Sequence, residues 1–495
     1  MVNITSAHQC FNQGNIAQAE QMYRQILSEN KNNVEALWGM GRVALTFNSY
    51  QRAYELFKRC ISLNSTLKQP QYLLSMSEAC LHLMRFEEAE QALLAANKVN
   101  GGSVATFTAL AIFYCEMGDF IQAGTFIKNI LKIVPANVQA FCLLVRCKKL
   151  TLANNSEREF VDDMFNKLTL STSVLTKREK ILLHFSFAEL FHENNEFEKA
   201  FSHFTQANAL QRSLINFSVV DMKDYFDSLL SSFTHSTFQQ LEPELELAET
   251  QKQQLTPIFI VGQPRSGSTL LEQMLIGHSA INSGGELPFM AGDIAKGIYQ
   301  LTGKHFPEGA SLLDNKQCRI LGEHYLKNLQ TLAPSSKYII DKMPANYQSI
   351  GLIKLILPQA KIIHIKRDPI DVSWSIFNNH FESLEPYFCS LIEIGQYHHL
   401  YQKIMDNWQA VLPNFVHHIS YEQLVETPEV EITKVLAFCK LEFQSNCLSM
   451  AGSKRYIRTL SDIQLREGIQ KNNEKKWLSY NKYLQPLFDA LNVTS

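Results

Sequence analysis

Small and large apolar residues recur at a fixed period near the start of the chain. Four alanines lie 34, 36 and 34 residues apart, and each is followed four positions later by a large apolar side chain. The alanines are Ala19, Ala53, Ala89 and Ala123, and the large side chains are Tyr23, Phe57, Leu93 and Ile127. Because small residues let helices cross closely, this pattern predicts a series of packed helices.

Turn-forming residues separate the predicted helices. Gly14, Asn48 and Gly118 each lie five residues before one of the alanines, and Pro135 closes the fourth unit. A period of 34 residues with small residues at helix crossings is the signature of the tetratricopeptide repeat, which this region resembles. Such helical hairpins cannot bury their own apolar stripe, so neighbours stack into a solenoid. The resemblance predicts a peptide or protein ligand on the concave face, with the aromatic residues of the repeats as core.

A further repeat follows a polar break in the chain. The same pattern is carried by Asn195, Phe197, Ala200, Phe204 and Ala207. It predicts another unit near residues 180–212. Residues 213–250 are predicted to be helical, with the acidic stretch 242–249 as a solvated helix face or linker. The sequence thus predicts tetratricopeptide repeats over residues 1–150 and a further helical repeat with a linker over residues 151–250.

From residue 257 the pattern changes to short β-rich runs that alternate with helical runs. The strand-like runs are 258–261, 338–340 and 361–365, and the helical runs include 269–276 and 346–357. Strands that alternate with helices predict a parallel sheet in an α/β domain. The predicted fold is therefore an α-solenoid followed by a parallel-sheet α/β domain over residues 255–490.

The composition restricts the functional classes. Of the 495 residues, 45% are apolar and 19% are charged, as in folded soluble proteins. The net charge of −2 predicts no nucleic-acid partner, so any anion site must be local. Residues 1–13 show no apolar leader, and no apolar run approaches the roughly 18 residues of a membrane span. Because the ten cysteines form no C-x-x-C pair, we expect reduced thiols, no metal site and a cytoplasmic location.

The loop at residues 262–269, Gly-Gln-Pro-Arg-Ser-Gly-Ser-Thr, carries the strongest chemical signal. It follows a predicted buried strand and precedes a predicted helix. Glycines let successive N–H groups point inward, and the helix N-terminus favours an anion. Nucleoside triphosphatases have lysine where this loop has Ser268, and the cation here is Arg265. The loop therefore predicts a phosphate or sulfate site unlike that of an ordinary ATPase, and we interpret the strand-end Asp341 as only coincidentally similar to a magnesium-positioning aspartate.

A second cationic site is predicted after the strand-like run 361–365. Arg367 follows this run, and Ser375 lies eight residues further on. If most of the interval is helical, about two turns separate the two residues. Both side chains can then face one phosphate group.

Together the two anion sites resemble those of the sulfotransferase family, whose donor is 3′-phosphoadenosine-5′-phosphosulfate (PAPS). The resemblance is closest to protein-tyrosine sulfotransferases and to bacterial-type proteins that join tetratricopeptide repeats to a P-loop-like sulfotransferase domain. It implies that Arg367 and Ser375 hold the 3′-phosphate and that the loop grips the 5′-phosphosulfate. The loop residues implied in donor binding are Arg265, Ser266, Gly267, Ser268 and Thr269.

The resemblance also implies catalytic residues. Glu286 stands where tyrosylprotein enzymes carry their catalytic glutamate, and Lys342 lies in a segment like the one that supplies the transition-state lysine. Tyr421 resembles a donor-contacting tyrosine, and Ser461 and Lys476 resemble parts of a flap over the donor. An attacking hydroxyl or phenol must lose a proton, which Glu286 can accept. Lys342 and Ser461 would stabilise the negative charge that develops during transfer, with no metal or protein nucleophile required.

Several positions depart from the family pattern. Ser268 stands where threonine is commoner, and Asn379 stands where tyrosylprotein enzymes have another phosphate-binding arginine. Residues 466–469, Arg-Glu-Gly-Ile, replace a proline-containing pattern in the flap. The histidine pairs at 398–399 and 417–418 lack metal-ligand spacing, so we predict that they are surface or packing residues.

The sequence thus predicts a sulfotransferase that moves a sulfuryl group from PAPS to a hydroxyl or phenol, including acceptors on a peptide or protein. A repeat scaffold that binds the nucleotide without catalysis is the alternative. Glu467, Gly468 and Asn379 favour the scaffold, whereas Glu286 and Lys342 oppose it. A nucleotide kinase or other phosphoryl transferase is disfavoured by the missing loop lysine.

Overall fold

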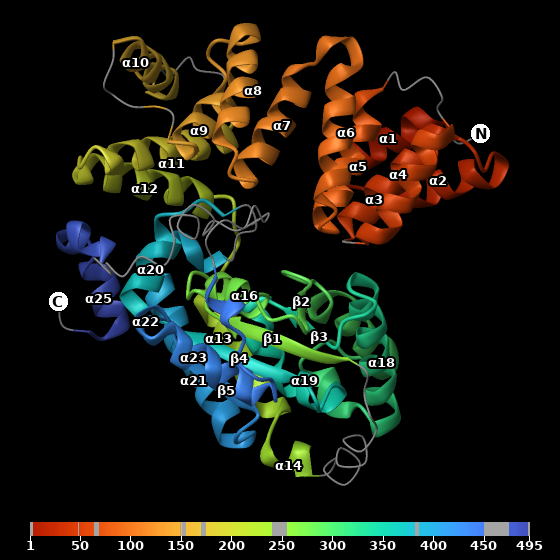
Figure 1. Ribbon diagram of the computed structural model, residues 1–495, viewed down its shortest axis with the longest axis vertical. Coiled ribbons are helices and arrows are strands. Elements are labelled where there is room, and N and C mark those ends of the chain that lie inside the picture. The colour runs from red at the N-terminus through yellow and green to blue at the C-terminus, as the bar shows by residue number, and fades with distance from the viewer. Residues whose placement is uncertain are drawn as a thin grey trace. The chain divides into compact units, whose positions relative to one another are not determined.

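The computed structural model describes most of the chain as two compact units, the first built mainly from residues 1–186 and the second mainly from residues 187–495 (Figure 1). The structural statements below concern the described residues. These are residues 3–47, 49–63, 69–148, 150, 155–169, 175–239, 255–381, 386–449 and 475–493. None of the helices among them is both long enough and apolar enough to cross a membrane.

The first unit consists of helices that pack in consecutive pairs, as predicted for tetratricopeptide repeats. The helices are α1 (Ile4–Asn12), α2 (Ile16–Glu29), α3 (Val34–Thr46), α4 (Tyr50–Leu63), α5 (Pro70–His82), α6 (Phe86–Lys98), η1 (Val99–Gly101), α7 (Val104–Glu116), α8 (Phe120–Ile133), α9 (Val138–Arg146) and α10 (Asn155–Thr169). Helix α11 (Lys177–Glu193) continues from this unit into the second one.

The recurrent alanines mark the closest helix packing in the first unit. All four are fully buried on the second helix of a pair. Two of the large residues that follow them pack against glycines: a Cβ on Gly39 would lie 2.4 Å from the Tyr23 ring, and one on Gly41 would lie 2.3 Å from the Phe57 ring. Since real Cβ atoms essentially never approach this closely, these two aromatic rings need a glycine opposite them. The period in the sequence therefore records helix-to-helix contacts.

The second unit is an α/β domain around a parallel five-stranded sheet with the order β2-β3-β1-β4-β5. The strands are β1 (Thr256–Gly262), β2 (Ile281–Ser283), β3 (Tyr338–Asp341), β4 (Lys361–Lys366) and β5 (Val416–Ser420). The helices are α12 (Phe197–Arg212), α13 (Val219–Ser232), α14 (His235–Gln239), α16 (Ser268–Leu275), η2 (Met290–Ile294), α17 (Ala295–Thr302), η3 (Glu308–Leu312), α18 (Asn315–Leu332), η4 (Pro344–Ser349), α19 (Ile350–Ile356), α20 (Pro369–Phe377), η5 (Pro386–Cys389), α21 (Leu391–Val411), α22 (Tyr421–Glu426), α23 (Pro428–Phe438), η6 (Ser445–Leu448), η7 (Lys476–Tyr483) and α25 (Gln485–Leu491).

The two faces of the sheet are covered by different helices because side chains alternate along each strand. On β1, Ile258 and Ile260 belong to a core shared with α16, α22 and α23. The intervening Phe259 faces the other way, and its ring centroid lies 5.6 Å from that of Tyr325 on α18. Burial on both faces explains why the central strand reads as an uninterrupted apolar run.

The prediction that residues 213–250 form a helix is wrong in its bounds. Residues 213–218 form a turn and an extended segment, and α13 begins only at Val219. A second break at Phe233–Thr234 separates α13 from α14, and residues 240–250 lie outside the described part of the chain. Ser218 has an extended backbone and caps α13 by accepting the backbone N–H of Val220, so the helix begins directly after it.

Helix α12, which the sequence pattern identifies as part of a repeat, packs within the second unit. Phe204 lies edge-on to Trp374 of α20, with ring centroids 5.8 Å apart. Phe201 stacks on Tyr483 at 4.6 Å. The buried side chain of Asn208 donates a 2.8 Å hydrogen bond to the carbonyl oxygen of Phe377, at the end of α20. The last repeat helix therefore shares a core with α20.

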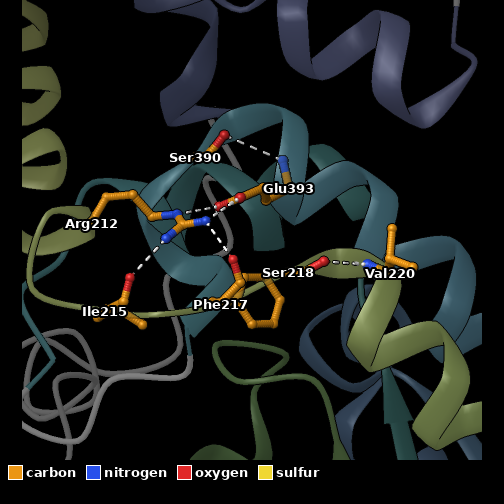
Figure 2. A network of polar contacts seen from close by, with 7 residues as sticks. All are labelled: Arg212, Ile215, Phe217, Ser218, Val220, Ser390 and Glu393. Atoms are coloured by element: carbon orange, nitrogen blue, oxygen red, sulfur yellow. Dashed lines mark hydrogen bonds and ion pairs between the residues drawn. The ribbon is translucent and has the colours of Figure 1, made fainter.

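A fork of hydrogen bonds fixes the end of α12 to α21 (Figure 2). Arg212 donates through Nε and Nη2 to both carboxylate oxygens of Glu393, at 3.0 and 2.9 Å. The same guanidinium donates to the carbonyl oxygens of Ile215 and Phe217, at 3.0 and 2.9 Å. This bidentate arrangement matches the planar guanidinium, which lysine cannot reproduce. It holds the extended segment before α13 in place.

We predict that Arg212→Ala destabilises the second unit by about 2 kcal/mol, because Glu393 is mostly buried and would lose both charge-assisted bonds. Urea unfolding followed by tryptophan fluorescence measures this, since Trp374, Trp408 and Trp477 all lie in that unit. The control is Lys223→Ala, which removes an exposed ion pair with Asp227 and should cost less than about 0.5 kcal/mol. Equal effects of the two variants would contradict the assigned role.

Candidate active site

The candidate site lies at the carboxyl end of the central strand. The loop from Gly262 to Gly267 joins β1 to α16, and β1 pairs with β3 on one side and β4 on the other. The strand order reverses here, because the chain adds β2 and β3 on one side before crossing to β4 and β5. In open parallel sheets the crevice at such a switch point is the usual place for ligands.

Glycine is required at both ends of the loop. At Gly267, with φ +101°, a Cβ would lie 2.3 Å from the ring of Tyr421. At Gly262, a Cβ would lie 2.6 Å from the carbonyl oxygen of Ile365 on β4. The loop is thus pressed against β4 and α22, which explains how a tyrosine 154 residues after Gly267 comes to border it. Sequence reasoning placed Tyr421 at this site from the family resemblance alone.

Two arginines and a serine from separate segments meet at the loop. Arg265, with a positive φ of 67°, donates from Nε to the Ser375 hydroxyl on α20 at 2.8 Å. Arg367 donates from Nη1 to the carbonyl oxygen of Arg265 at 3.2 Å, and its guanidinium lies 4.4 Å from the centroid of the Tyr421 ring. The two anion sites predicted from the sequence are therefore adjacent and form one cationic region.

The electrostatics of this region favour an anion. Burial, together with the smaller effect of the neighbouring positive charge of Arg367, lowers the pKa of Arg265 to about 10. Arg265 still carries its charge near neutral pH. Within the described part of the chain, the buried hydroxyl of Ser266 and the buried Nε of Arg367 have no hydrogen-bond partner. A bound phosphate or sulfate would stabilise the two close cations and would accept from the two unpartnered donors.

The remaining predicted donor-site residues are placed as follows. Ser268 and Thr269 open α16 and are buried beside the loop. Asn379 donates from its amide to the carbonyl oxygen of Ser375 at 2.9 Å, so it binds the backbone at the end of α20. Lys476 is exposed at the start of η7, and it is its neighbour Lys475 that lies 3.9 Å from the Asp368 carboxylate. Ser461, Glu467 and Gly468 lie outside the described residues.

Glu286 and Lys342 form a close ion pair just past the carboxyl ends of β2 and β3. The Lys342 ammonium donates to Glu286 Oε1 at 2.6 Å. The two residues follow neighbouring parallel strands, β2 and β3, whose carboxyl ends meet at one edge of the sheet. A backbone hydrogen bond also holds the two segments together, since the Lys342 N–H donates to the carbonyl oxygen of Gly285 at 2.9 Å. The base and the cation implied by the family resemblance are thus in direct contact.

A second carboxylate at Lys342 was missed by sequence reasoning. Glu272 on α16 lies 3.7 Å from the Lys342 ammonium, and only 7% of its side chain is exposed. Burial acts to lower the pKa of Lys342, but Glu286 and Glu272 outweigh it and raise this pKa above its usual value. A signal was present in the sequence, because Glu272 is the one charged residue among the apolar positions of the helical run 269–276.

Asp341, at the end of β3, has structural hydrogen bonds. Its Oδ2 accepts from the Tyr325 hydroxyl at 2.7 Å and from the Asn346 amide at 3.3 Å. Burial raises the pKa of Asp341 to about 7, although these hydrogen bonds favour the charged form. Among the described residues, no group of histidine, cysteine or acidic side chains is arranged to hold a metal ion.

One histidine of the two predicted pairs contacts the loop, and the others pack elsewhere in the second unit. His398 is buried and its Nδ1 lies 2.8 Å from the side-chain oxygen of Gln263 in the loop. His364 on β4 bonds to the Tyr401 hydroxyl and, through Nδ1, to Nδ1 of His418 at 2.8 Å. Burial lowers the pKa of His398 and of His418 to about 4, so both rings are neutral near pH 7. His398 and His418 are therefore packing residues, in line with the predicted surface or packing role of the pairs.

The fold defines a parallel α/β domain with a glycine-bounded, cationic loop at the end of its central strand, preceded by helical repeats. Comparison with known families agrees. Residues 257–445 match the sulfotransferase family, and residues 5–134 match the middle TPR-like domain of cilia and flagella-associated protein 70. The chain thus combines a TPR-like region with a sulfotransferase-family domain, and the predicted combination is confirmed.

Individual relatives extend the comparison. An uncharacterized protein of Aquifex aeolicus (strain VF5) is 29% identical over 330 residues, which is 65% of this chain and 43% of that protein. This chain therefore spans less than half the length of that relative. Among solved structures, the sulfotransferase domain of the Synechococcus PCC 7002 olefin synthase is 20% identical, covers 47% of this chain and 96% of its own, and has a TM-score of 0.31. The TPR protein YrrB is 15% identical, with coverages of 33% and 83% and a TM-score of 0.28.

We predict that Asp341→Asn changes how stability depends on pH. The folded pKa of Asp341 is about 7 and its unperturbed value is 3.8, so the native state prefers the protonated form. The resulting stability is present below about pH 4 and is lost as the pH rises through 7. Asparagine mimics the protonated form. Between pH 4 and pH 8, the free energy of unfolding of the variant should therefore rise relative to that of the wild type by up to about 4 kcal/mol, at 1.36 kcal/mol per pKa unit.

Urea unfolding at a series of pH values measures this difference. Asp293→Asn, which removes an exposed charge from the same unit, is the control for the loss of charge alone. If the stability curves of Asp341→Asn and the wild type run parallel from pH 4 to pH 8, Asp341 is not the buried acid described here.

Proposed function

We propose that the chain transfers a sulfuryl group from PAPS to an oxygen acceptor. The observation that carries the proposal is the arrangement of residues along the carboxyl edge of the sheet. After the central strand, the loop cation Arg265 contacts Ser375 and Arg367. After the neighbouring strands β2 and β3, Glu286 and Lys342 form an ion pair at the same edge. A donor with phosphate groups at both the 3′ and 5′ positions needs two anion contacts close together. An acceptor hydroxyl needs a base near the transferring group.

The donor fits the residues present. The loop amides, Ser266 and Arg265 would bind the 5′-phosphosulfate, and Arg367 with Ser375 would bind the 3′-phosphate. The unpartnered hydroxyl of Ser266 and the unpartnered Nε of Arg367 are available for these contacts within the described part of the chain. The Tyr421 ring, which already packs on Gly267 and Arg367, supplies a flat wall for the donor. Ser461 and Lys476 complete the donor site in this proposal, as members of the flap.

The proposed chemistry is a direct displacement at sulfur. The acceptor oxygen forms a bond to sulfur as the bond between sulfur and the bridging phosphate oxygen breaks, and the acceptor proton passes to Glu286. Negative charge grows on the bridging oxygen and the sulfuryl oxygens. Lys342, Arg265 and the loop amides are fixed before the reaction begins, so they stabilise this charge without reorganising. The products are the sulfated acceptor and adenosine 3′,5′-bisphosphate.

The acceptor and partners are proposed from the domain combination. We propose that a peptide or protein binds the concave face of the repeats in residues 1–150 and brings a tyrosine or other hydroxyl to the domain in residues 255–490. Residues 151–250 then connect recruitment to catalysis. A cytoplasmic location stays a prediction from composition. The inactive scaffold is the second candidate, and the flap departures Glu467 and Gly468 favour it.

Ligand binding tests the donor assignment. By calorimetry, adenosine 3′,5′-bisphosphate should bind at least tenfold more tightly than ATP, because the loop lacks the lysine that grips a triphosphate and Arg367 can hold a 3′-phosphate. Comparable ATP affinity would overturn the sulfotransferase proposal.

The same experiment carries a matched control. Arg367→Ala should weaken binding of the bisphosphate by about 10- to 100-fold, which is the value of a charge-assisted bond of about 1.5–3 kcal/mol. Binding of adenosine 5′-monophosphate, which has no 3′-phosphate, should change much less. Equal losses for both ligands would show that Arg367 does not bind the 3′-phosphate.

Catalysis is tested at Glu286. Glu286→Ala should reduce transfer from PAPS to simple phenols and tyrosine peptides by at least about 100-fold, the usual contribution of a general base, while sparing bisphosphate binding. Formation of adenosine 3′,5′-bisphosphate reports turnover. Glu323→Ala, an exposed carboxylate on α18, is the control. Unchanged turnover would rule out Glu286 as the base, and a wild-type chain that binds the bisphosphate without any transfer would support the scaffold.

A further inference from the structure

The ammonium of Lys342 lies between two carboxylates with very different exposure. The Glu286 side chain is 48% exposed to solvent, whereas the Glu272 side chain is 7% exposed and is therefore buried. Lys342 itself is 3% exposed. Among the described residues, these are the two acidic groups that pair with it. The cluster therefore joins three elements: the turn after β2, the end of β3, and α16.

Glu272 is itself held in place. The Ser283 hydroxyl at the end of β2 donates to Glu272 Oε1, and the same hydroxyl accepts the N–H of Gly285 at 2.9 Å. One chain of contacts thus runs from α16 through Ser283 to the residue before Glu286. Because α16 begins at Ser268 in the donor loop, the position of Glu272 is tied to that loop.

We infer that Glu272 is a positioning residue for the transfer reaction: it keeps Lys342 charged and in place when Glu286 takes up the acceptor proton. This inference rests on the proposed function. Once Glu286 is protonated, it no longer supplies a counter-charge to Lys342. A buried ammonium without a counter-charge tends to lose its proton. Glu272 supplies the charge that remains, at the moment when Lys342 must stabilise the leaving oxygen.

The arrangement also explains why the two carboxylates differ in exposure. The base must meet an acceptor that arrives from solvent, so Glu286 lies at the surface. A residue that acts only through Lys342 gains by being buried, because a charge interacts more strongly where water is excluded. Glu272 touches Lys342 from α16 and takes no proton from the acceptor in this scheme. Its effect is therefore on the rate of transfer and not on the binding of the donor.

The test compares Glu272→Gln with Glu431→Gln in the full chain. Glutamine keeps the shape of Glu272 and can still accept the Ser283 hydrogen bond, but it removes the charge. Glu431 is a buried glutamate paired with Lys434 on α23, so it controls for the loss of a buried charge elsewhere in the domain. For Glu272→Gln we expect kcat to fall at least tenfold, with the KM for PAPS and the Kd for adenosine 3′,5′-bisphosphate within threefold of wild type. Glu431→Gln should keep wild-type values.

A second measurement does not depend on turnover. Competitive acetylation with acetic anhydride, read at the Lys342 peptide by mass spectrometry over pH 7–11, reports the protonation of Lys342. In Glu272→Gln the midpoint should move down by at least one pH unit, while Glu431→Gln leaves it unchanged. If the wild type transfers nothing, the proposed function fails, yet this shift still decides whether Glu272 maintains the charge on Lys342. A wild-type midpoint in Glu272→Gln would overturn the inference.

A third variant, Ser283→Ala, tests the inference if Glu272→Gln does not fold. Ser283→Ala leaves both charges but removes the hydrogen bond that orients Glu272. We expect kcat to fall three- to tenfold, with donor KM unchanged. A folded Ser283→Ala variant with wild-type kcat and a wild-type Lys342 midpoint would show that the orientation of Glu272 is irrelevant, and would contradict the proposal.

Discussion

The second unit depends on keeping one buried ammonium charged. Moving an ammonium out of water is costly unless opposite charges accompany it, and Lys342 meets that condition through Glu286 and Glu272. The requirement constrains the fold. The strand β2 must pair with β3 so that Glu286 reaches the end of β3, and α16 must pack on the sheet so that Glu272 approaches from the other side. The loop at residues 262–267, which leads into α16, is positioned by the same packing.

Features made of consecutive residues could be predicted from the sequence, whereas contacts between residues far apart in the chain could not. The loop at 262–269 was predicted because strand, glycines and helix are consecutive. The contact between Arg265 and Ser375 spans 110 residues, and only the family resemblance brought the two together. Neither a consecutive motif nor the family resemblance pointed to Glu272. It belongs to no consecutive motif, and its partner Lys342 is 70 residues away, directly after a strand whose neighbours in the sheet the sequence does not reveal.

The two strands that the hydrophobic pattern missed are the edges of the sheet. The strand β2 has three residues, and two of them, Asn282 and Ser283, are polar. The strand β5 contains His417 and His418, which interrupt an apolar run. Central strands are buried on both faces and must be apolar, whereas edge strands are partly solvated and carry weaker patterns. The order of the strands, and with it the neighbour of β3 that carries Glu286, was therefore the part of the fold least visible in the sequence.

Helix α12 shows why a repeat pattern does not by itself locate a domain boundary. Small and large apolar residues at fixed spacing encode a helix that packs closely, but they do not specify the partner. For Phe204 the partner is Trp374, and for Asn208 it is the carbonyl oxygen of Phe377. Both partners lie on α20, the helix that carries Ser375. A displacement of α12 must therefore repack α20, so the last repeat helix and the proposed 3′-phosphate site share one set of packing constraints.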